Sequence, residues 1–495
     1  MAKFKPYQTG LESGWTLNIC DLLGKDHLVF FIEHCVSQLD TSKIEATYSC
    51  LGPNAFHPKL QLSVLFYGYM QGIRSGRKLA TACKEQLPFI YLSKGYFPKK
   101  TAINDFRKAN VGYFKDYFQK FLSLFDKNRK DASTSIFDGS KIAANASKYQ
   151  TREKATYERW LVHLQEDIAA IEQELQEQEQ KDLAKDLAKD LAKKKQLCTR
   201  ISQLIEPLEK ADEKINLTDP DAPRMKGKKG NTGMFYNVQV GCNSHQTILH
   251  ASVNQDGNDK KQLQPCIEGV QENTSQKVEQ AIADPGYASF SNYEYLEEEG
   301  IIGYIPDQDF NKDFKDKPYH RAHFQKHPDK EEFICPQGNP LPFFKNKKDG
   351  SYQFKVYKGT QCHNCPVKEL CTKADFRTIA IEEREPLRQQ MRQRLQSEQG
   401  REMYKKRLHP VEAIFAHLKF NLGYTHFLLR GLANVQAEFL LMCIGYNLMK
   451  LAGNFTFFEH HTSLKAAQLA NSFFIQFFQR TFCFILSKNI ISTKY

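Results

Sequence analysis

The sequence predicts an α/β (α+β) fold in which a mixed β-sheet is flanked by helices. Residues 221–306 contain short apolar runs of strand composition that alternate with helical patterns. Adjacent strands followed by alternating strand and helix are typical of a mixed sheet covered by helices. The sequence around this region differs in character. It predicts an N-terminal all-helical domain, a helical arm at residues 149–220 and a cysteine-containing insertion at residues 307–400.

Residues 1–130 are predicted to form a helical DNA-binding domain. His57 and Pro58 open a run with helical apolar spacing, and a basic turn precedes a second helix near Thr101. Short helices that are rich in lysine and arginine suit DNA binding of the helix-turn-helix kind. The alternative is an ordinary helical domain with a solvated basic face. The candidate DNA contacts are Arg74, Arg77, Lys99 and Lys100, with Lys226, Lys228 and Lys229 in a later basic loop.

The predicted core begins with residues 131–148, where a short β-branched and aromatic run ends at Asp138. Further strands are predicted at residues 234–240, 247–253, 276–284 and 301–306, with helices at 258–271 and 289–299. Residues 401–455 are expected to hold a helix with Glu412 and a following helix, and residues 456–495 are expected to form a helical tail. Pro410 is tolerated only in a first helical turn, so the Glu412 helix is expected to begin near it.

Residues 149–220 are highly charged and predict a helical hairpin or short coiled coil that serves as an interaction or spacer arm. Leu161, Leu164, Ile168, Ile171 and Leu175 form an apolar stripe at helical spacing. The tetrapeptide Lys-Asp-Leu-Ala begins at Lys181 and recurs at residues 185 and 189. A four-residue period drifts by about 40° per repeat around a helix, so these leucines cannot form a long straight seam.

Asp138, Asp284 and Glu412 are the candidate catalytic residues. Two are expected at strand ends and one on a helix, an arrangement that lets three carboxylates converge on two divalent cations. Mg²⁺ and Mn²⁺ prefer such oxygen ligands, and two of them, roughly 3.5–4 Å apart, serve phosphodiester displacement. Taken singly, each acid has a simpler interpretation. The aspartates are more often turn residues, and the glutamate is more often a solvated helix residue.

Four cysteines in the insertion, Cys335, Cys362, Cys365 and Cys371, form a candidate structural Zn²⁺ site. An iron–sulfur cluster is the minority alternative, and four reduced thiols without metal are the simplest one. The insertion is expected to be loop-rich and polar, so that metal binding would supply folding energy.

The composition favours a polyanionic partner, because the chain of 495 residues carries a formal charge of +12. Thirteen cysteines without a secretory signal indicate a reducing cytoplasm. No uncharged apolar stretch reaches membrane-spanning length. The most apolar segment, residues 472–487, is expected to form a packed or partner-facing helix.

The order of the motifs resembles that of bacterial insertion-sequence transposases of the DDE class, which have an RNase H-like catalytic core, and is closest to the 1182-type group. The resemblance rests on seven segments: residues 57–69, 137–146, 236–239, 283–287, 304–306, 407–419 and 427–432. It implies that Asp138, Asp284 and Glu412 are the DDE triad with two Mg²⁺ or Mn²⁺ ions. It also implies double-stranded DNA as the partner, at inverted-repeat ends and at the target, and a homodimer or higher oligomer on the DNA of the bacterial nucleoid.

Related transposases carry a Tyr, Arg, Glu, Lys signature, for which Tyr404, Arg407, Glu412 and Lys419 are the candidates. Arg407 and Lys419 are therefore further candidate catalytic residues. The spacing from Arg407 to Glu412 is one residue longer than in the best-known form of that signature. The alternatives are an RNase H-like DNA nuclease, a catalytically degenerate DNA-binding relative, or a helical scaffold protein. Inverted repeats flanking the coding region would distinguish a transposase from a nuclease.

Overall fold

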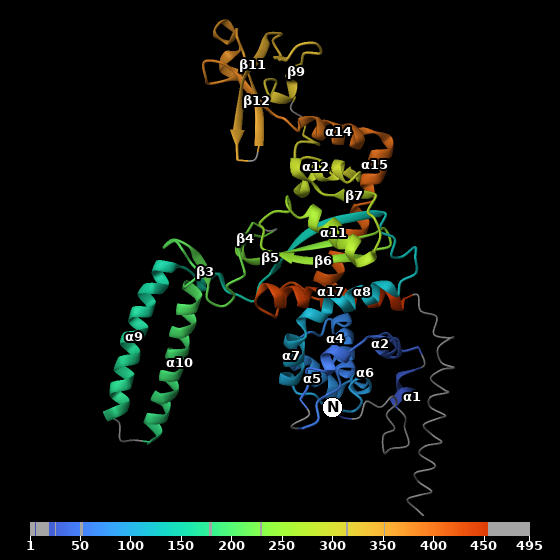
Figure 1. Cartoon of the computed structure of the whole chain (residues 1–495), viewed down its shortest axis with the longest axis vertical. Coiled ribbons are helices and arrows are strands. Elements are labelled where there is room, and N and C mark those ends of the chain that lie inside the picture. Colours follow the sequence, from blue (N-terminus) through green and yellow to red (C-terminus); the bar gives the residue numbers. More distant parts are fainter. Residues whose placement is uncertain are drawn as a thin grey trace, which may run out of the picture. The chain divides into compact units, whose positions relative to one another are not determined.

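The computed structural model describes residue 5 and residues 19–24, 26–49, 53–177, 181–227, 230–312, 315–350 and 352–453. The chain divides into two compact units, whose elements are labelled in Figure 1. Unit 1 contains the described residues up to Asp126, then Ala143–Ala222 and those from His417. Unit 2 contains Lys127–Ile142 and Pro223–Ala416. The segment 401–455, predicted as one piece, is thus divided between the units.

Unit 2 is built around the predicted mixed sheet. Its strands are β1 (Thr134–Ala143), β4 (Arg224–Lys226), β5 (Thr232–Cys242), β6 (Ile248–Asn254), β7 (Gln280–Ala283) and β8 (Ile302–Tyr304). The order is β4-β5-β1-β7-β8, with β6 paired to β5. Strands β5 and β6 are antiparallel, whereas β1, β7 and β8 run parallel. Ala281, Ile282 and Ala283 of β7 are fully buried, as expected for an interior parallel strand.

Helices cover this sheet. They are α11 (Leu263–Thr274), α12 (Phe290–Glu298), α14 (Glu385–Gln396), α15 (Glu398–Lys405) and α16 (Leu408–Ala416). Helix α11 packs against β5 and β6, α12, α14 and α15 lie against β8, and α16 contacts β5. The Ser289 side chain caps α12 by accepting from the Asn292 amide. The predicted fold, a mixed sheet flanked by helices and consistent with an RNase H-like core, is confirmed.

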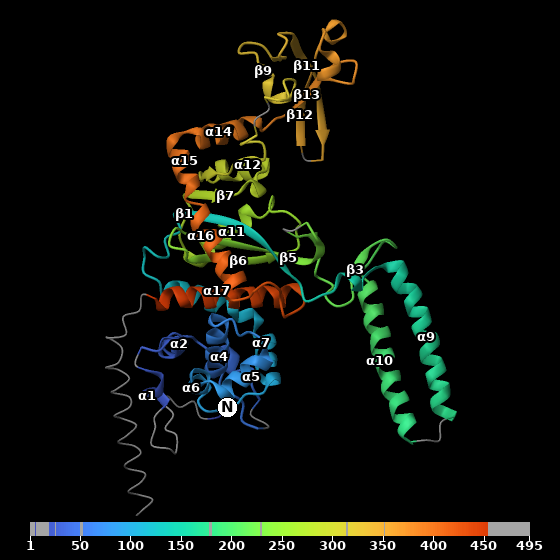
Figure 2. The ribbon, with the colours of Figure 1, turned by 180° about the vertical axis from the view of Figure 1, so that it is seen from behind.

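The cysteine-containing insertion of unit 2 forms a second sheet, visible in Figure 2. Its antiparallel strands, in the order β13-β12-β11-β10-β9, are β9 (Gln325–Lys326), β10 (Glu332–Ile334), β11 (Pro340–Asp349), β12 (Tyr352–Lys358) and β13 (Thr378–Glu382), with the short helix α13 (Lys368–Cys371). The expectation of a loop-rich segment was wrong. The outer half of β11 is exposed throughout, so this strand shows no alternation that the sequence could reveal.

Unit 1 contains the predicted N-terminal helices and, with them, the long helix α17 (Leu432–Ala452). The others are α1 (Ile19–Leu23), α2 (Leu28–Ser37), α3 (Ser42–Glu45), α4 (Pro58–Met70), α5 (Gly76–Glu85), α6 (Leu87–Leu92), α7 (Lys100–Ala109) and α8 (Phe114–Ser123). Helix α4 begins at Pro58, where the sequence predicted a helical run to open, and the His57 side chain caps it. Helix α4 is buried almost all round. Helix α17 packs against it closely, because a Cβ at Gly445 would lie 3.0 Å from the Tyr69 carbonyl carbon.

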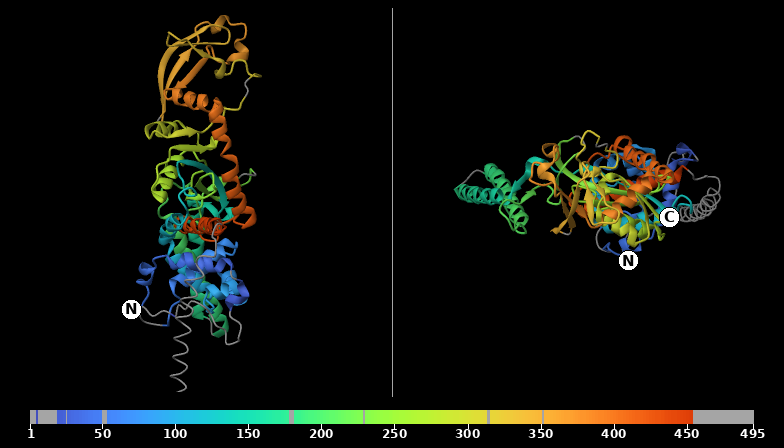
Figure 3. Two further views of the ribbon diagram at one scale, coloured as in Figure 1. Left: turned by 90° about the vertical axis from the view of Figure 1, so that its right-hand side faces the viewer. Right: turned by 90° about the horizontal axis from the view of Figure 1, so that it is seen from above.

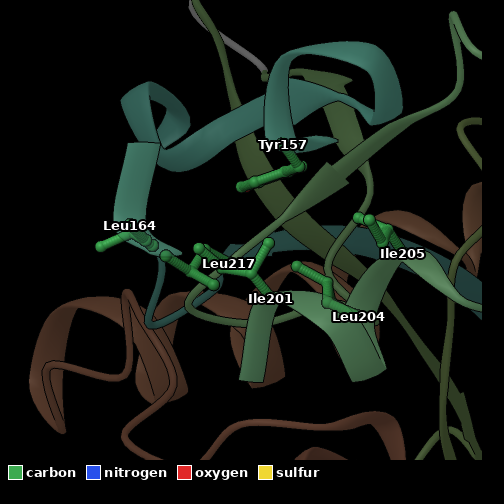
Figure 4. Packing of buried hydrophobic residues seen from close by; sticks show 6 residues of the cluster. All are labelled: Tyr157, Leu164, Ile201, Leu204, Ile205 and Leu217. Carbon is green, nitrogen blue, oxygen red and sulfur yellow. The ribbon is translucent and has the colours of Figure 1, made fainter. Parts of the chain in front are cut away.

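The predicted helical hairpin is confirmed in unit 1. Helices α9 (Lys154–Glu177) and α10 (Lys181–Ile205) lie side by side in Figures 1 and 2 and in the right-hand view of Figure 3, next to the short pair β2 (Thr151–Glu153) and β3 (Lys214–Asn216). Figure 4 shows the apolar cluster at its base, formed by Tyr157, Leu164, Ile201, Leu204, Ile205 and Leu217. Leu183, in the first repeat unit, is 46% exposed, so the repeat buries no continuous seam.

The predicted helix at residues 472–487 lies outside the described residues. None of the described helices has both the length and the apolar composition needed to cross a membrane.

Candidate active site

The parallel pairing of β1 with β7 brings Asp138 and Asp284 together. The register aligns Phe137 with Ala283, so the next residues on the two neighbouring strands are the two aspartates. Asp138 was expected to end its strand, but β1 continues to Ala143. The strand extends past the end of β7 because it also pairs with β5 on its other side. Asp284 follows the last residue of β7, as predicted.

Local backbone contacts hold both carboxylates. Asp138 Oδ1 accepts from the Gly139 amide at 2.9 Å. Asp284 Oδ1 accepts from the Gly286 amide at 2.9 Å and caps a single 3₁₀ turn, Pro285–Tyr287. The turn interpretation of Asp284 is therefore correct at the local level, and it is compatible with a role in chemistry because the cap orients the carboxylate.

Arg407 and Tyr404 lie beside the two aspartates. Arg407 Nη1 is 4.0 Å from Asp138 Oδ2, and the guanidinium lies 6.0 Å from the centre of the Tyr404 ring. Burial raises the pKa of Tyr404; Arg407 lowers it, and Asp284 and Asp138 raise it further. The Arg407 Nε atom is buried and has no hydrogen-bond partner among the described residues. The Arg407 side chain is 14% exposed, and a guanidinium that is not completely shielded from solvent can bind an anionic ligand such as phosphate.

Glu412 lies on α16, which begins at Leu408 with Pro410 in its first turn, as predicted. Its side chain is exposed, and no described interaction joins it to Asp138 or Asp284. Lys419 was expected on the same face of the same α-helix, two turns on. That spacing is wrong, because residues His417–Asn421 form a π-helix. Lys419 belongs to unit 1, whereas the other candidate catalytic residues belong to unit 2.

The sequence analysis missed a polar network next to the aspartates. Asn237 and Gln239 of β5 both donate to Asp259 Oδ1, at 2.7 and 2.6 Å. The motif containing Asn237 and Gln239 was recognised without a role. Asp259 was placed inside a predicted helix from residue 258, whereas α11 begins at Leu263. Only its position after a predicted strand could have singled it out.

Tyr287 extends this network, because its buried hydroxyl donates to the Gln239 side-chain oxygen. Burial raises the pKa of Tyr287 far above its usual range, and the charges of Cys266, Asp259, Asp138 and Asp284 raise it further. All three aspartates therefore act on the same buried phenol.

The four predicted zinc ligands share one small cavity in the insertion. Burial raises the pKa of the Cys371 thiol; Arg377 lowers it, and the other three cysteines raise it. Cys335 and Cys371 pack against the apolar core of the insertion sheet. No group of three or more His, Cys, Asp or Glu side chains in the described part of the chain is arranged to hold a metal ion. The four thiols lie near one another, and so do the aspartates at their separate site, but neither group is arranged as a complete set of metal ligands.

The predicted DNA contacts are mostly exposed. Arg77, near the start of α5, and Lys99 and Lys100, at the start of α7, are solvent-exposed. The two helices are neighbours, and a Cβ at Gly76 would lie 2.3 Å from the Asn104 side-chain oxygen of α7. Lys226 is exposed on β4, whereas Lys228 and Lys229 lie outside the described residues.

Arg74 is corrected. It is 6% exposed, and its Nη1 lies 2.9 Å from the buried carboxylate of Glu438 and donates to the His426 carbonyl. Its guanidinium also lies over the Tyr424 ring. These contacts explain the basic residue without DNA, so Arg74 is removed from the candidate phosphate contacts.

Two protein-family models match parts of the chain. Residues 334–452 match a transposase DDE domain, and residues 18–109 match a transposase domain (DUF772). The first range contains Arg407, Glu412 and Lys419, and the second contains Arg77, Lys99 and Lys100. A comparison with curated proteins found no match.

Proposed function

We propose that this chain, an insertion-sequence transposase of the DDE class, binds the terminal inverted repeats of its own element and catalyses metal-dependent DNA cleavage and strand transfer. The observation that carries this proposal is the register of β1 with β7, which places Asp138 beside Asp284. Two acids on adjacent parallel strands, within a transposase, form one side of a site for phosphodiester chemistry.

Asp138, Asp284 and Glu412 would hold two Mg²⁺ or Mn²⁺ ions, which prefer carboxylate oxygens. The donor chemistry of the aspartates fits such ions, and their backbone contacts orient them. Glu412 is exposed on α16, a helix that contacts the strand next to β1. In this proposal, its carboxylate joins the two aspartates when DNA binds. The assignment of the chain to the 1182-type group stays a prediction.

When bound, the two cations activate the attacking oxygen and stabilise the leaving one. In cleavage, a water oxygen bonds to phosphorus and the bond to the 3′-oxygen breaks, which leaves a 3′-hydroxyl. In strand transfer, that hydroxyl attacks a target phosphodiester and a new 3′-hydroxyl is released from the target. Arg407 would bind the reacting phosphate through its guanidinium, and Lys419 would hold a terminal phosphate. Neither step needs a covalent bond between protein and DNA.

DNA binding is assigned to Arg77, Lys99 and Lys100 of unit 1, with Lys226, Lys228 and Lys229 as additional contacts. Exposed lysine and arginine side chains supply most of the affinity for a polyanion by releasing counterions. A homodimer or higher oligomer would allow both ends of the element to be bound in one complex.

Cys335, Cys362, Cys365 and Cys371 are proposed to hold one structural Zn²⁺. The shared cavity and the mutual effect of the thiols on Cys371 support this assignment. Four thiolates are the ligand set of a closed tetrahedral zinc site. The metal would stabilise an insertion whose own apolar core is only four buried residues.

A plasmid carrying the element's two inverted repeats tests the proposed function. The purified chain should nick this plasmid in Mg²⁺ or Mn²⁺, but neither in EDTA nor when the repeats are scrambled. Nicking that ignores the repeats would favour the alternative of a general nuclease. Repeat binding without nicking in either metal would favour a catalytically degenerate relative.

A further inference from the structure

Asp259 is a third carboxylate near Asp138 and Asp284, because its two oxygens lie close to the glycines that follow these aspartates in the chain. A Cβ at Gly139, the residue after Asp138, would lie 2.6 Å from Asp259 Oδ1. A Cβ at Gly286 would lie 2.9 Å from Asp284 Oδ1 and 3.3 Å from Asp259 Oδ2. A side chain at Gly139 would meet both the Asp259 carboxylate and the Gln239 amide, and one at Gly286 would crowd the Asp284 and Asp259 carboxylates.

The surroundings of Asp259 hold its carboxylate in a defined orientation. Its Oδ1 atom accepts from the side-chain amides of Asn237 and Gln239, which are almost fully buried. The opposite end of the Gln239 amide accepts from the buried Tyr287 hydroxyl. Since Gln239 donates at one end and accepts at the other, both ends of its amide are satisfied. Buried polar side chains arranged in this way fix one conformation of the group that they bind.

The second oxygen, Asp259 Oδ2, is not engaged by any described donor, and the described residues include no ion-pair partner for Asp259. Arg407 is the cation beside Asp138. Three carboxylates placed near one another repel, and the repulsion is strong where water is partly excluded. A divalent cation that is coordinated by oxygens of all three carboxylates offsets this repulsion.

We propose that Asp259 is a further metal-binding residue of the active centre, which coordinates a divalent cation through a carboxylate oxygen together with Asp138 and Asp284. Asn237, Gln239 and Tyr287 are its positioning residues. This inference rests on the proposed function, since it concerns the same cation. It gives the Tyr-Asn-Val-Gln segment of β5 a role in the chemistry, and it supplies a third acid that does not belong to α16.

The test measures Mn²⁺ binding by the full chain, by calorimetry and by the electron paramagnetic resonance of free Mn²⁺. Asp259→Asn is the informative variant, because its side-chain oxygen can still accept from Asn237 and Gln239 while the charge and Oδ2 are lost. The control is Asp256→Asn, an exposed acid of the same loop that accepts from Gln262. Asp259→Asn should weaken Mn²⁺ binding by at least about tenfold, whereas Asp256→Asn should bind like the wild type. In EDTA, the melting temperature of Asp259→Asn should not fall below that of Asp256→Asn.

Two outcomes would overturn the inference while leaving the proposed function intact. The first is wild-type Mn²⁺ affinity in Asp259→Asn, while Asp138→Asn binds the ion at least tenfold more weakly. The second is a large loss of melting temperature in EDTA for Asp259→Asn that Asp259→Glu restores without restoring Mn²⁺ binding, since Asp259 would then be a structural acceptor. If the wild-type chain neither binds Mn²⁺ nor nicks DNA in its presence, the proposed function fails and this inference fails with it.

Discussion

Arg74 and Glu438 are a buried ion pair that ties the turn after α4 to α17 within unit 1. Glu438 is completely buried and also accepts from the Leu428 and Leu429 amides, at 2.9 and 2.8 Å. Its charge is thus matched by one guanidinium and two amides. The sequence places Arg74 in a basic stretch and gives no sign of a partner 364 positions away. Long-range pairing of this kind is invisible to a local pattern, which is why Arg74 was predicted as a DNA contact.

Arg74→Ala should destabilise the chain by about 3–5 kcal/mol, because it leaves the Glu438 carboxylate buried without its countercharge. The measurement is thermal or urea unfolding followed by circular dichroism. Arg77→Ala is the matched control; this residue is exposed nearby and should change stability by about 0.5 kcal/mol or less. Equal stability of the two variants would show that the pair does not hold α17 in place.

The two aspartates were predictable because each ends an apolar run that is buried in the sheet. Glu412 was predictable as a helical residue near Pro410. Convergence of the three acids was also inferred from the sequence, but their actual spacing was not predictable, because it depends on the register of β1 with β7 and on the packing of α16, which no single segment encodes. Asp259 was missed for the same reason: its importance comes from two glycines and two amides on other elements.

At the scale of elements, the hairpin α9–α10 shows a pattern that the sequence predicts well. The apolar stripe of α9 faces its partner, and cross-hairpin ion pairs such as Lys194–Asp167, at 2.7 Å, lie on the outside. The insertion sheet shows the opposite case. The outer half of its longest strand, β11, is exposed and rich in lysine, so composition suggested loops where the structure has an antiparallel sheet.

Deletion of one Lys-Asp-Leu-Ala unit should leave cleavage and stability nearly unchanged. The repeat leucines are half-buried or exposed, and the cluster at the hairpin base is formed by other residues. The measurement is the nicking rate and melting temperature of variants that lack one or two units. A matched deletion of four residues that includes Ile201 and Leu204 removes part of the base cluster and should lower the melting temperature. Loss of all activity after removal of eight repeat residues would show that the arm length is set by a partner or by DNA.

Cys362→Ser should lower the zinc content from about one per chain toward zero and weaken the insertion, since a structural site needs all four ligands. The measurements are elemental analysis of protein purified under reducing conditions and limited proteolysis of residues 324–382. Cys443→Ser, at a buried thiol of α17 in unit 1, is the control and should keep its zinc. Wild-type protein with neither zinc nor iron would contradict the assignment.

At the scale of the whole molecule, the sequence predicts the local elements but only partly predicts which distant segments are grouped in each unit. Helical character before residue 130 and the mixed sheet could be predicted, since periodicity and composition are local. The grouping of α17 with the N-terminal helices in unit 1 could not. It depends on the close approach of Gly445 to Tyr69 and on the Arg74–Glu438 pair, which join residues more than 350 positions apart.

The basic surface of unit 1 predicts a steep salt dependence of binding to the inverted repeats. Replacing Arg77, Lys99 and Lys100 with glutamine should reduce the slope of log K against log salt by about 0.9 for each phosphate that the variant no longer neutralises. The measurement is fluorescence anisotropy of labelled end DNA at several salt concentrations. The control replaces three exposed lysines of the hairpin arm, Lys185, Lys189 and Lys193, with glutamine, so that both variants carry the same net charge. If the control lowers the slope as much as the first variant, binding is not localised at α5 and α7.

The central claim is that Asp138 and Asp284, with Glu412, form the catalytic centre of this transposase. Nicking of inverted-repeat DNA in Mg²⁺ and in Mn²⁺ by Asp138→Ala, Asp284→Ala and Glu412→Gln tests it most directly, with end binding measured on the same preparations. Glu402→Gln, an exposed acid of α15 that pairs with Lys405, is the control and should nick at the wild-type rate. We expect each of the three variants to bind the ends and to lose nicking in both metals. Nicking at the wild-type rate by Asp138→Ala or Asp284→Ala would contradict the claim.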